Sequence, residues 1–114
     1  MKRILSELNK TNGVLGSAVL APDGLVIARE ASTSVSSEGL WQQGLKAFSA
    51  LADMAQAAGC GEATAVNIEW GQARMLAHVV PGGILFAAMR PDVPLGQAQT
   101  AVQRAAAAIR EAGR

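Results

Sequence analysis

The feature that most constrains the fold is a hairpin whose side chains are apolar on both faces. Residues 13–30, GVLGSAVLAPDGLVIARE, read as two strands joined by a tight turn at APDG. In that turn Pro22 presets its φ angle, Asp23 can accept a hydrogen bond from the backbone two residues on, and Gly24 tolerates a positive φ. Strands without a polar side are typical of a sheet that is covered on both faces. The sequence therefore predicts a sheet with helices packed on either side.

The rest of the chain is expected to supply three helices and three further strands. Periodicity and turn residues place helices at 2–11, 38–58 and 93–112, and strands at 14–21, 25–30, 63–70, 73–80 and 84–89. Tight turns between neighbouring strands make the sheet mostly antiparallel. The predicted fold class is α+β: an α/β/α sandwich around a central five-stranded, mostly antiparallel sheet, with element order α-β-β-α-β-β-β-α, in a single domain over residues 1–114.

Local patterns also predict the position of two strands and the caps of two helices. Residues 84–89 are apolar on both faces, so this strand belongs in the middle of the sheet, whereas 63–70 alternates apolar with polar side chains and belongs at an edge. Ser36 or Ser37 is expected to cap the middle helix, and Asp92 the last helix.

The composition excludes several classes of function. The chain has 114 residues, half of them apolar and 17% charged, with a formal net charge of +1, so no bulk field attracts nucleic acid or acidic lipid. Its one cysteine cannot form an internal disulfide, and its apolar stretches are shorter than the ~20 residues of a membrane span. The first residues lack a secretion-signal pattern. We therefore expect a cytoplasmic protein with no nucleic-acid partner and no membrane insertion.

The middle helix has more apolar surface than a single sheet needs. About half of its circumference is apolar at 3.6 residues per turn, whereas a helix lying on one sheet needs an arc of roughly 100°. The excess indicates a contact beyond the chain's own sheet, and Trp41 is the kind of large aromatic residue that anchors interfaces. The alternative is a helix that lies in a concave sheet and has no further partner.

The strand at 63–70 offers a second surface to the same partner. A regular edge strand with Val66 and Ile68 on one face can pair with another chain. Two copies could join edge to edge, with their middle helices meeting above the joint. The predicted dimer or partner interface consists of Leu40, Trp41, Leu45, Phe48, Val66 and Ile68.

No pattern in the sequence indicates catalysis. His78 is the only histidine, so a metal site would need carboxylates, and none lies at a convincing spacing. Cys60 follows the end of a helix, where the helix dipole disfavours a thiolate. We therefore expect no catalytic residue, no cofactor and no metal. One alternative is a small-ligand sensor, since His78 and Arg74 share a face of their strand.

Four segments resemble, in their order and spacing, the roadblock / dynein light chain superfamily. They are GVLGSAVLAPDGLVI at 13–27, LWQQGLKAFSALADMAQAAGCG at 40–61, IEWGQARMLAHVVPGGILFAAM at 68–89 and PLGQAQTAVQRA at 94–105. Together they span nearly the whole chain. The resemblance implies a homodimer in which the central helix meets the central helix and the third strand meets the third strand.

The resemblance also implies a partner and a role. Bacterial and archaeal members of this superfamily commonly regulate Ras-like small GTPases, and eukaryotic relatives serve as scaffolds; these proteins are not enzymes in their own right. We therefore expect a non-catalytic homodimeric adaptor that binds a Ras-like small GTPase and modulates its GTP hydrolysis. A structural scaffold subunit without a GTPase partner is the alternative.

Overall fold

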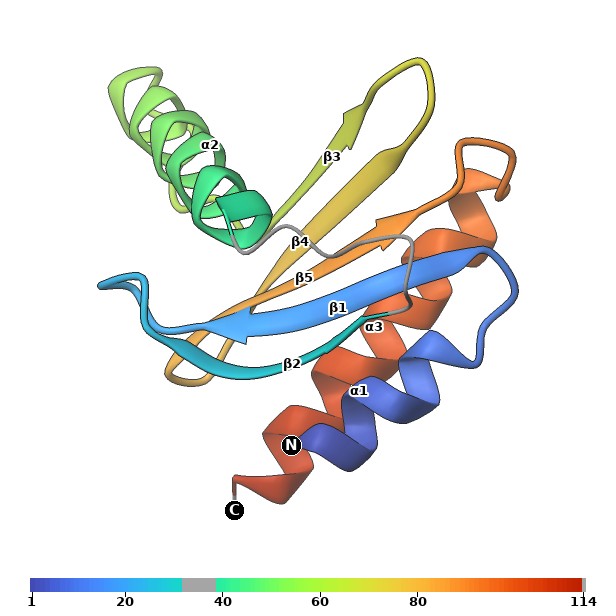
Figure 1. Cartoon of the computed structure of the whole chain (residues 1–114). Helices are drawn as coiled ribbons and strands as arrows, with labels where there is room; N and C mark the ends of the chain where they lie inside the picture. The colour runs from blue at the N-terminus through green and yellow to red at the C-terminus, as the bar shows by residue number, and fades with distance from the viewer. Residues whose placement is uncertain (32–38, 114) are drawn as a thin grey trace.

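Five strands form one antiparallel sheet in the order β2-β1-β5-β4-β3 (Figure 1). The computed structural model describes residues 1–31 and 39–113. Its elements are α1 (Lys2–Asn9), β1 (Val14–Leu20), β2 (Val26–Ala31), α2 (Gly39–Ala57), β3 (Ala65–Glu69), β4 (Arg74–Val80), β5 (Gly83–Met89) and α3 (Leu95–Ala112). The α+β fold class and the element order predicted from the sequence are confirmed, with β5 in the middle of the sheet and β3 at one edge.

Helices cover both faces of the sheet, as the apolar hairpin requires. In Figure 1, α1 and α3 lie side by side on one face and α2 lies on the other. Alternate residues of β5 therefore point into two separate cores. Leu85 and Met89 belong to the core under α1 and α3, whereas Phe86 packs in the α2-side core with Trp41 and Phe48. Burial of such a side chain contributes roughly 1.5–3 kcal/mol, so both cores stabilise the sheet.

Glycine and aspartate shape the β1–β2 turn, and a second glycine allows β5 to lie close to β1. Gly24 has a φ of 96°, and the backbone N–H of Leu25 donates to Oδ1 of Asp23 at 3.1 Å, as the APDG sequence predicts. At the start of β5, a Cβ on Gly83 would collide with the carbonyl oxygen of Leu20. A residue without a side chain is thus required where β5 joins β1.

A chain of hydrogen bonds ties α1 to the β1–β2 hairpin. The hydroxyl of Ser17, which is fully buried on β1, donates to Oδ1 of Asn9 at 2.8 Å. The amide nitrogen of Asn9 donates in turn to the backbone carbonyl of Glu30 on β2 at 3.0 Å. The buried hydroxyl is therefore satisfied, and the last residue of α1 is fixed against both strands.

Two local expectations from the sequence are wrong. β2 is covered only in part: Val26 and Ala28 pack against the two cores, but β2 is the outer strand of the sheet, Ile27 is 46% exposed, and Leu25 just before it is 66% exposed. Asp92 does not cap the last helix, because α3 begins after Pro94 without a side-chain cap, and Asp92 instead accepts a hydrogen bond from Nε of Arg90 at 3.2 Å. The proposed caps Ser36 and Ser37 lie outside the described residues.

Candidate interaction surface

The two halves of α2 differ in what covers them. Trp41, Leu45 and Phe48 are buried against the sheet. Gly44 lets the helix approach the sheet closely, since a Cβ there would lie 3.1 Å from the sulfur of Met75 on β4. Beyond Phe48 no residue of the helix is buried, and this half extends away from the sheet (Figure 1). Met54 in this half is 63% exposed, so the C-terminal half of α2 presents an apolar face that the described chain does not cover.

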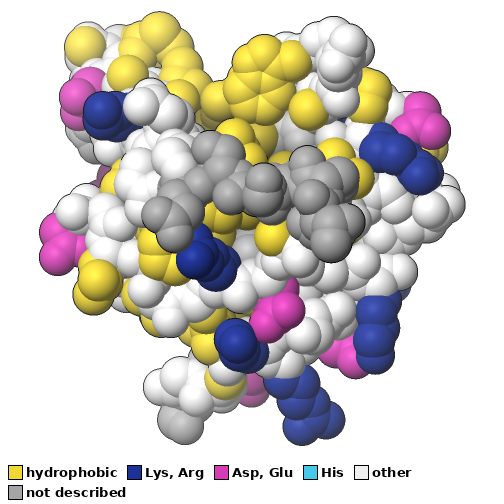
Figure 2. Space-filling view, in the orientation of Figure 1, with side chains coloured by type: hydrophobic (Ala, Val, Ile, Leu, Met, Phe, Trp, Pro, Cys, Tyr) yellow, Lys and Arg dark blue, Asp and Glu magenta, His cyan; other side chains and the backbone are white. Residues whose placement is uncertain are grey.

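β3 presents a second uncovered surface, at the edge of the sheet. Among the described strands it pairs with β4 alone. Val66 and Ile68 stand opposite Ala77 and Met75, which places both on the α2 face, where they are half-buried. Trp70, directly after the strand, is 51% exposed. Figure 2 shows hydrophobic side chains gathered over α2 and in the space between α2 and β3.

The structure divides the six predicted interface residues into two groups. Trp41, Leu45 and Phe48 form part of the chain's own α2-side core, and Trp41 is only 2% exposed. Leu40, Val66 and Ile68 are half-buried and keep accessible surface. Their contact with a partner stays a prediction, and the second group has more surface to offer.

The six predicted residues do not include the apolar side chains that are most exposed around this surface. Met54 shares the apolar arc of α2 with the predicted residues, and Trp70 continues the alternation of Val66 and Ile68. Val79 stands beside them on the α2 face of β4, opposite Ile84, and is 38% exposed. The periodicity was therefore present in the sequence, but it does not distinguish a side chain covered by the sheet from one beyond its reach.

Arg74, the first residue of β4, holds the end of β3 in place. Nη2 of the nearly buried Arg74 lies 2.8 Å from Oε1 of Glu69, and its Nε donates to the same oxygen at 3.2 Å. Its Nη1 donates to the backbone carbonyl of Val93, just before α3. The guanidinium thus connects the last residue of β3 to the loop before α3. Its positive charge is balanced by the carboxylate of Glu69.

The surroundings of His78 offer little to a ligand. A cavity of about 130 Å³ lies between β3, β4 and α3, and its polar lining comes from Asn67, His78, Gln99 and Gln103. Arg74, which shares a strand face with His78, is directed to Glu69 instead. Among residues 1–31 and 39–113, no three His, Cys, Asp or Glu side chains come together to hold a metal ion. Cys60 is an exposed free thiol.

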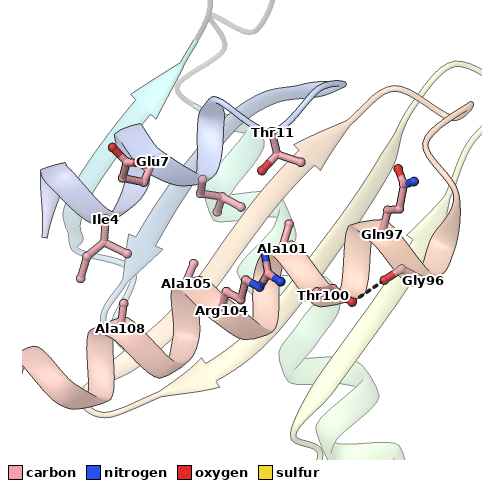
Figure 3. A pocket seen from close by; sticks show the side chains of 11 residues that line it. Ile4, Glu7, Thr11, Gly96, Gln97, Thr100, Ala101, Arg104, Ala105 and Ala108 are labelled. Atoms are coloured by element: carbon pink, nitrogen blue, oxygen red, sulfur yellow. Dashed lines mark hydrogen bonds between the residues drawn. The ribbon is translucent and has the colours of Figure 1, made fainter.

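A larger groove lies on the same side of the sheet, between α1 and α3. It has a volume of about 570 Å³, and Figure 3 shows Ile4 of α1 facing the small residues Ala105 and Ala108 of α3 across it. The hydrogen bond from Lys10 to Glu7 lowers the pKa of that carboxyl.

None of the described helices has both the length and the apolar composition that crossing a bilayer requires.

Sheet order, helix layers and the free third strand together define the roadblock/LC7 fold. MglB of Myxococcus xanthus superposes with a TM-score of 0.85 at 13% identity, covering 96% of this chain and 84% of that one. The gliding protein MglB of Thermus thermophilus gives 0.81 at 15% identity, with the same coverage. A Roadblock/LC7 domain from Streptomyces avermitilis gives 0.77 at 14% identity, covering 97% and 95%.

Comparison of sequences adds a closer relationship. No protein-family model matches the chain. Two uncharacterised proteins of Methanocaldococcus jannaschii, MJ1340 and MJ0310, are each 36% identical to it over 108 residues, which is 95% of this chain and 95% of theirs. The chain therefore belongs to one family with these archaeal proteins.

Proposed function

We propose that this protein is a non-catalytic homodimeric adaptor that binds a Ras-like small GTPase and modulates its GTP hydrolysis. The observation that carries the proposal is the free β3 edge beside an apolar helix half that extends past the sheet, on a roadblock/LC7 fold. Relatives of this fold include the gliding protein MglB. In the superfamily that the sequence resembles, bacterial and archaeal members commonly regulate such GTPases.

The dimer joins the two uncovered surfaces of one chain to those of a second copy. β3 of each copy extends the sheet of the other, and the C-terminal halves of the two α2 helices pack together above the joint. Val66, Ile68 and Met54 then lose exposed apolar surface, which contributes roughly 25 cal/mol for each Å² that is buried. A two-fold arrangement satisfies both copies with the same residues.

The adaptor acts by binding one nucleotide state of the GTPase more tightly than the other. Its two packed cores and single sheet make it a stiff platform, so its preference shifts the population of the GTPase switch regions instead of remodelling the adaptor. Neither the cavity near His78 nor Cys60 takes part in this action.

Binding to the GTPase is tested with the untagged dimer and a small GTPase of the source organism. We expect calorimetry to show at least about tenfold tighter binding to one of the two loaded forms, GDP or a non-hydrolysable GTP analogue, which corresponds to ~1.4 kcal/mol. A stable dimer that binds neither form contradicts the GTPase assignment and supports a structural scaffold.

The helix contact is tested separately by Met54→Glu. Because Met54 is exposed in the single chain, the variant should keep its fold, while the dimer dissociation constant should rise about tenfold as ~1.5 kcal/mol of apolar burial is lost. Gln56→Glu, an exposed position on the polar side of α2, is the matched control and should leave dimerisation unchanged. Equal behaviour of the two variants in sedimentation velocity would remove this half of α2 from the interface.

A further inference from the structure

The backbone of β3 alternates between its neighbour and its free edge. The N–H of Val79 donates to the carbonyl of Thr64 at 2.9 Å, and the N–H of Trp70 donates to the carbonyl of Ala73 at 2.8 Å. In an antiparallel ladder such hydrogen-bonded pairs occur at every second residue. Even-numbered residues of this strand thus turn their backbone groups toward β4. The N–H and C=O groups of Ala65, Asn67 and Glu69 point out of the free edge.

This edge lacks the features that usually prevent pairing. The β3–β4 register runs without a shift, and the strand AVNIE contains no proline. Its only charged side chain is Glu69, and the carboxylate is held by Arg74 of the same sheet. Nothing on the strand therefore repels a second strand approaching in the plane of the sheet.

The pattern of outward groups selects one register for a second copy of the same strand. In a two-fold antiparallel pair centred on Asn67, Ala65 faces Glu69 of the second copy and Asn67 faces its own counterpart. All three outward residues of each strand then exchange both of their backbone hydrogen bonds. In a pair centred on Val66 or on Ile68, only two of the three outward residues would find a hydrogen-bonding partner within the second strand.

The side chains agree with this register on both faces of the sheet. On the α2 face, Val66 lies opposite Ile68 of the second copy, and Thr64 lies opposite the exposed Trp70. On the other face the two Asn67 side chains meet at the two-fold axis, where amide groups can donate to and accept from each other. The apolar Val66 therefore meets the apolar Ile68 and the two amides meet each other, which are stabilising kinds of cross-strand pair. Ala65 faces Glu69, and this pair brings no two like charges together.

We infer that two copies of this chain join β3 to β3 in the antiparallel register centred on Asn67, with the two Asn67 residues paired at the symmetry axis. The inference rests on the dimer of the proposed function and adds the residues that face each other. It assigns Asn67 as the position where the two copies are in register.

Single cysteines in a Cys60→Ser chain test this register. Residues paired across the joint have Cα atoms about 4.5–5.5 Å apart, whereas diagonal neighbours are about 7–8 Å apart. We expect Asn67→Cys alone to form a disulfide-linked dimer under mild oxidation. Val66→Cys and Ile68→Cys should form one when the two variants are mixed, and each alone about tenfold more slowly, since its own counterpart lies beyond the usual Cα separation of a disulfide.

The outcomes separate the register from the dimer itself. Sedimentation of the Cys60→Ser parent first establishes whether it is a dimer. A dimer in which Val66→Cys or Ile68→Cys alone reacts fastest overturns the register and leaves the proposed dimer intact. A dimer in which none of the three positions reacts overturns pairing through β3. A parent that is a monomer at all concentrations overturns both the register and the proposed dimer.

Discussion

The two edges of the sheet end in different ways. At the β2 edge α1 lies against the strand, the amide of Asn9 donates to the carbonyl of Glu30, and the β1–β2 register shifts between Val19 and Leu20. At the β3 edge the register with β4 is regular, and the outward backbone groups have no partner among the described residues. Register shifts and covering elements are common means of blocking strand addition.

The charges follow the same division. β2 carries Arg29 and Glu30, and Glu30 also lies 3.7 Å from Nζ of Lys2. β3 carries Glu69 alone, and its charge is engaged by Arg74. The β2 edge therefore blocks the addition of a strand, whereas the β3 edge permits it. Substitutions at the β2 edge should affect the stability of the fold, and substitutions at the β3 edge should affect association.

The largest effect is expected from Asn67→Pro at the free edge. Proline removes the central outward N–H, and its ring obstructs an added strand, yet it takes no hydrogen bond from the β3–β4 ladder. Loss of the bonds of the central pair, at ~0.5–1.5 kcal/mol each, together with this obstruction should raise the dimer dissociation constant at least about a hundredfold. Analytical ultracentrifugation measures this change.

Two neighbouring variants show whether that effect comes from the direction of the N–H group. Asn67→Ala keeps the N–H and removes only the side-chain amide pair, so its dimer dissociation constant should rise by no more than about fivefold. Val66→Pro should instead destabilise the chain itself, because the N–H of Val66 points toward β4. If Asn67→Pro dimerises like the parent, the β3 edge is not the joint, and the contrast between the two edges loses its functional meaning.

The protected edge is tested by Asn9→Ala. The substitution leaves the fully buried Ser17 hydroxyl without its acceptor and the Glu30 carbonyl without its donor. An unsatisfied buried group costs about 1–3 kcal/mol, so we expect the free energy of unfolding in urea to fall by ~2 kcal/mol, with dimer affinity unchanged. The exposed Asn12→Ala is the control. A variant that keeps full stability would show that α1 is held by its apolar contacts alone.

The sequence predicted the fold because periodicity and turn residues report directly on which side of an element is buried. The apolar strand at 84–89 had to be central, and APDG had to turn. It also predicted that α2 has more apolar surface than one sheet covers. It failed at Asp92, whose carboxylate is engaged by Arg90, and at β2, where apolar side chains face solvent at an edge.

The candidate interface could be predicted only in part, because a helical wheel projects the whole length of a helix onto one circle. Trp41 and Met54 both fall within the apolar half of the wheel, about 140° apart, yet only Trp41 lies over the sheet, beside the close approach at Gly44. The length of sheet beneath a helix depends on tertiary packing. The contact between Arg74 and Glu69 likewise depends on how β3 and β4 pair, which composition does not encode.

The smallest effect is expected from Lys2→Ala, which removes the ammonium group that pairs with Glu30 at the protected edge. Nζ of Lys2 lies 3.7 Å from Oε1 of Glu30, and its side chain is 77% exposed. Exposed pairs of this kind contribute about 0.2–1 kcal/mol and are screened by salt, so urea unfolding should change by less than ~0.5 kcal/mol, and by nothing measurable in about 1 M NaCl. Lys10→Ala, which breaks the exposed Glu7–Lys10 pair on the same helix, is the control. A loss as large as that of Asn9→Ala would mean that charge, and not the amide hydrogen bond, secures the β2 edge.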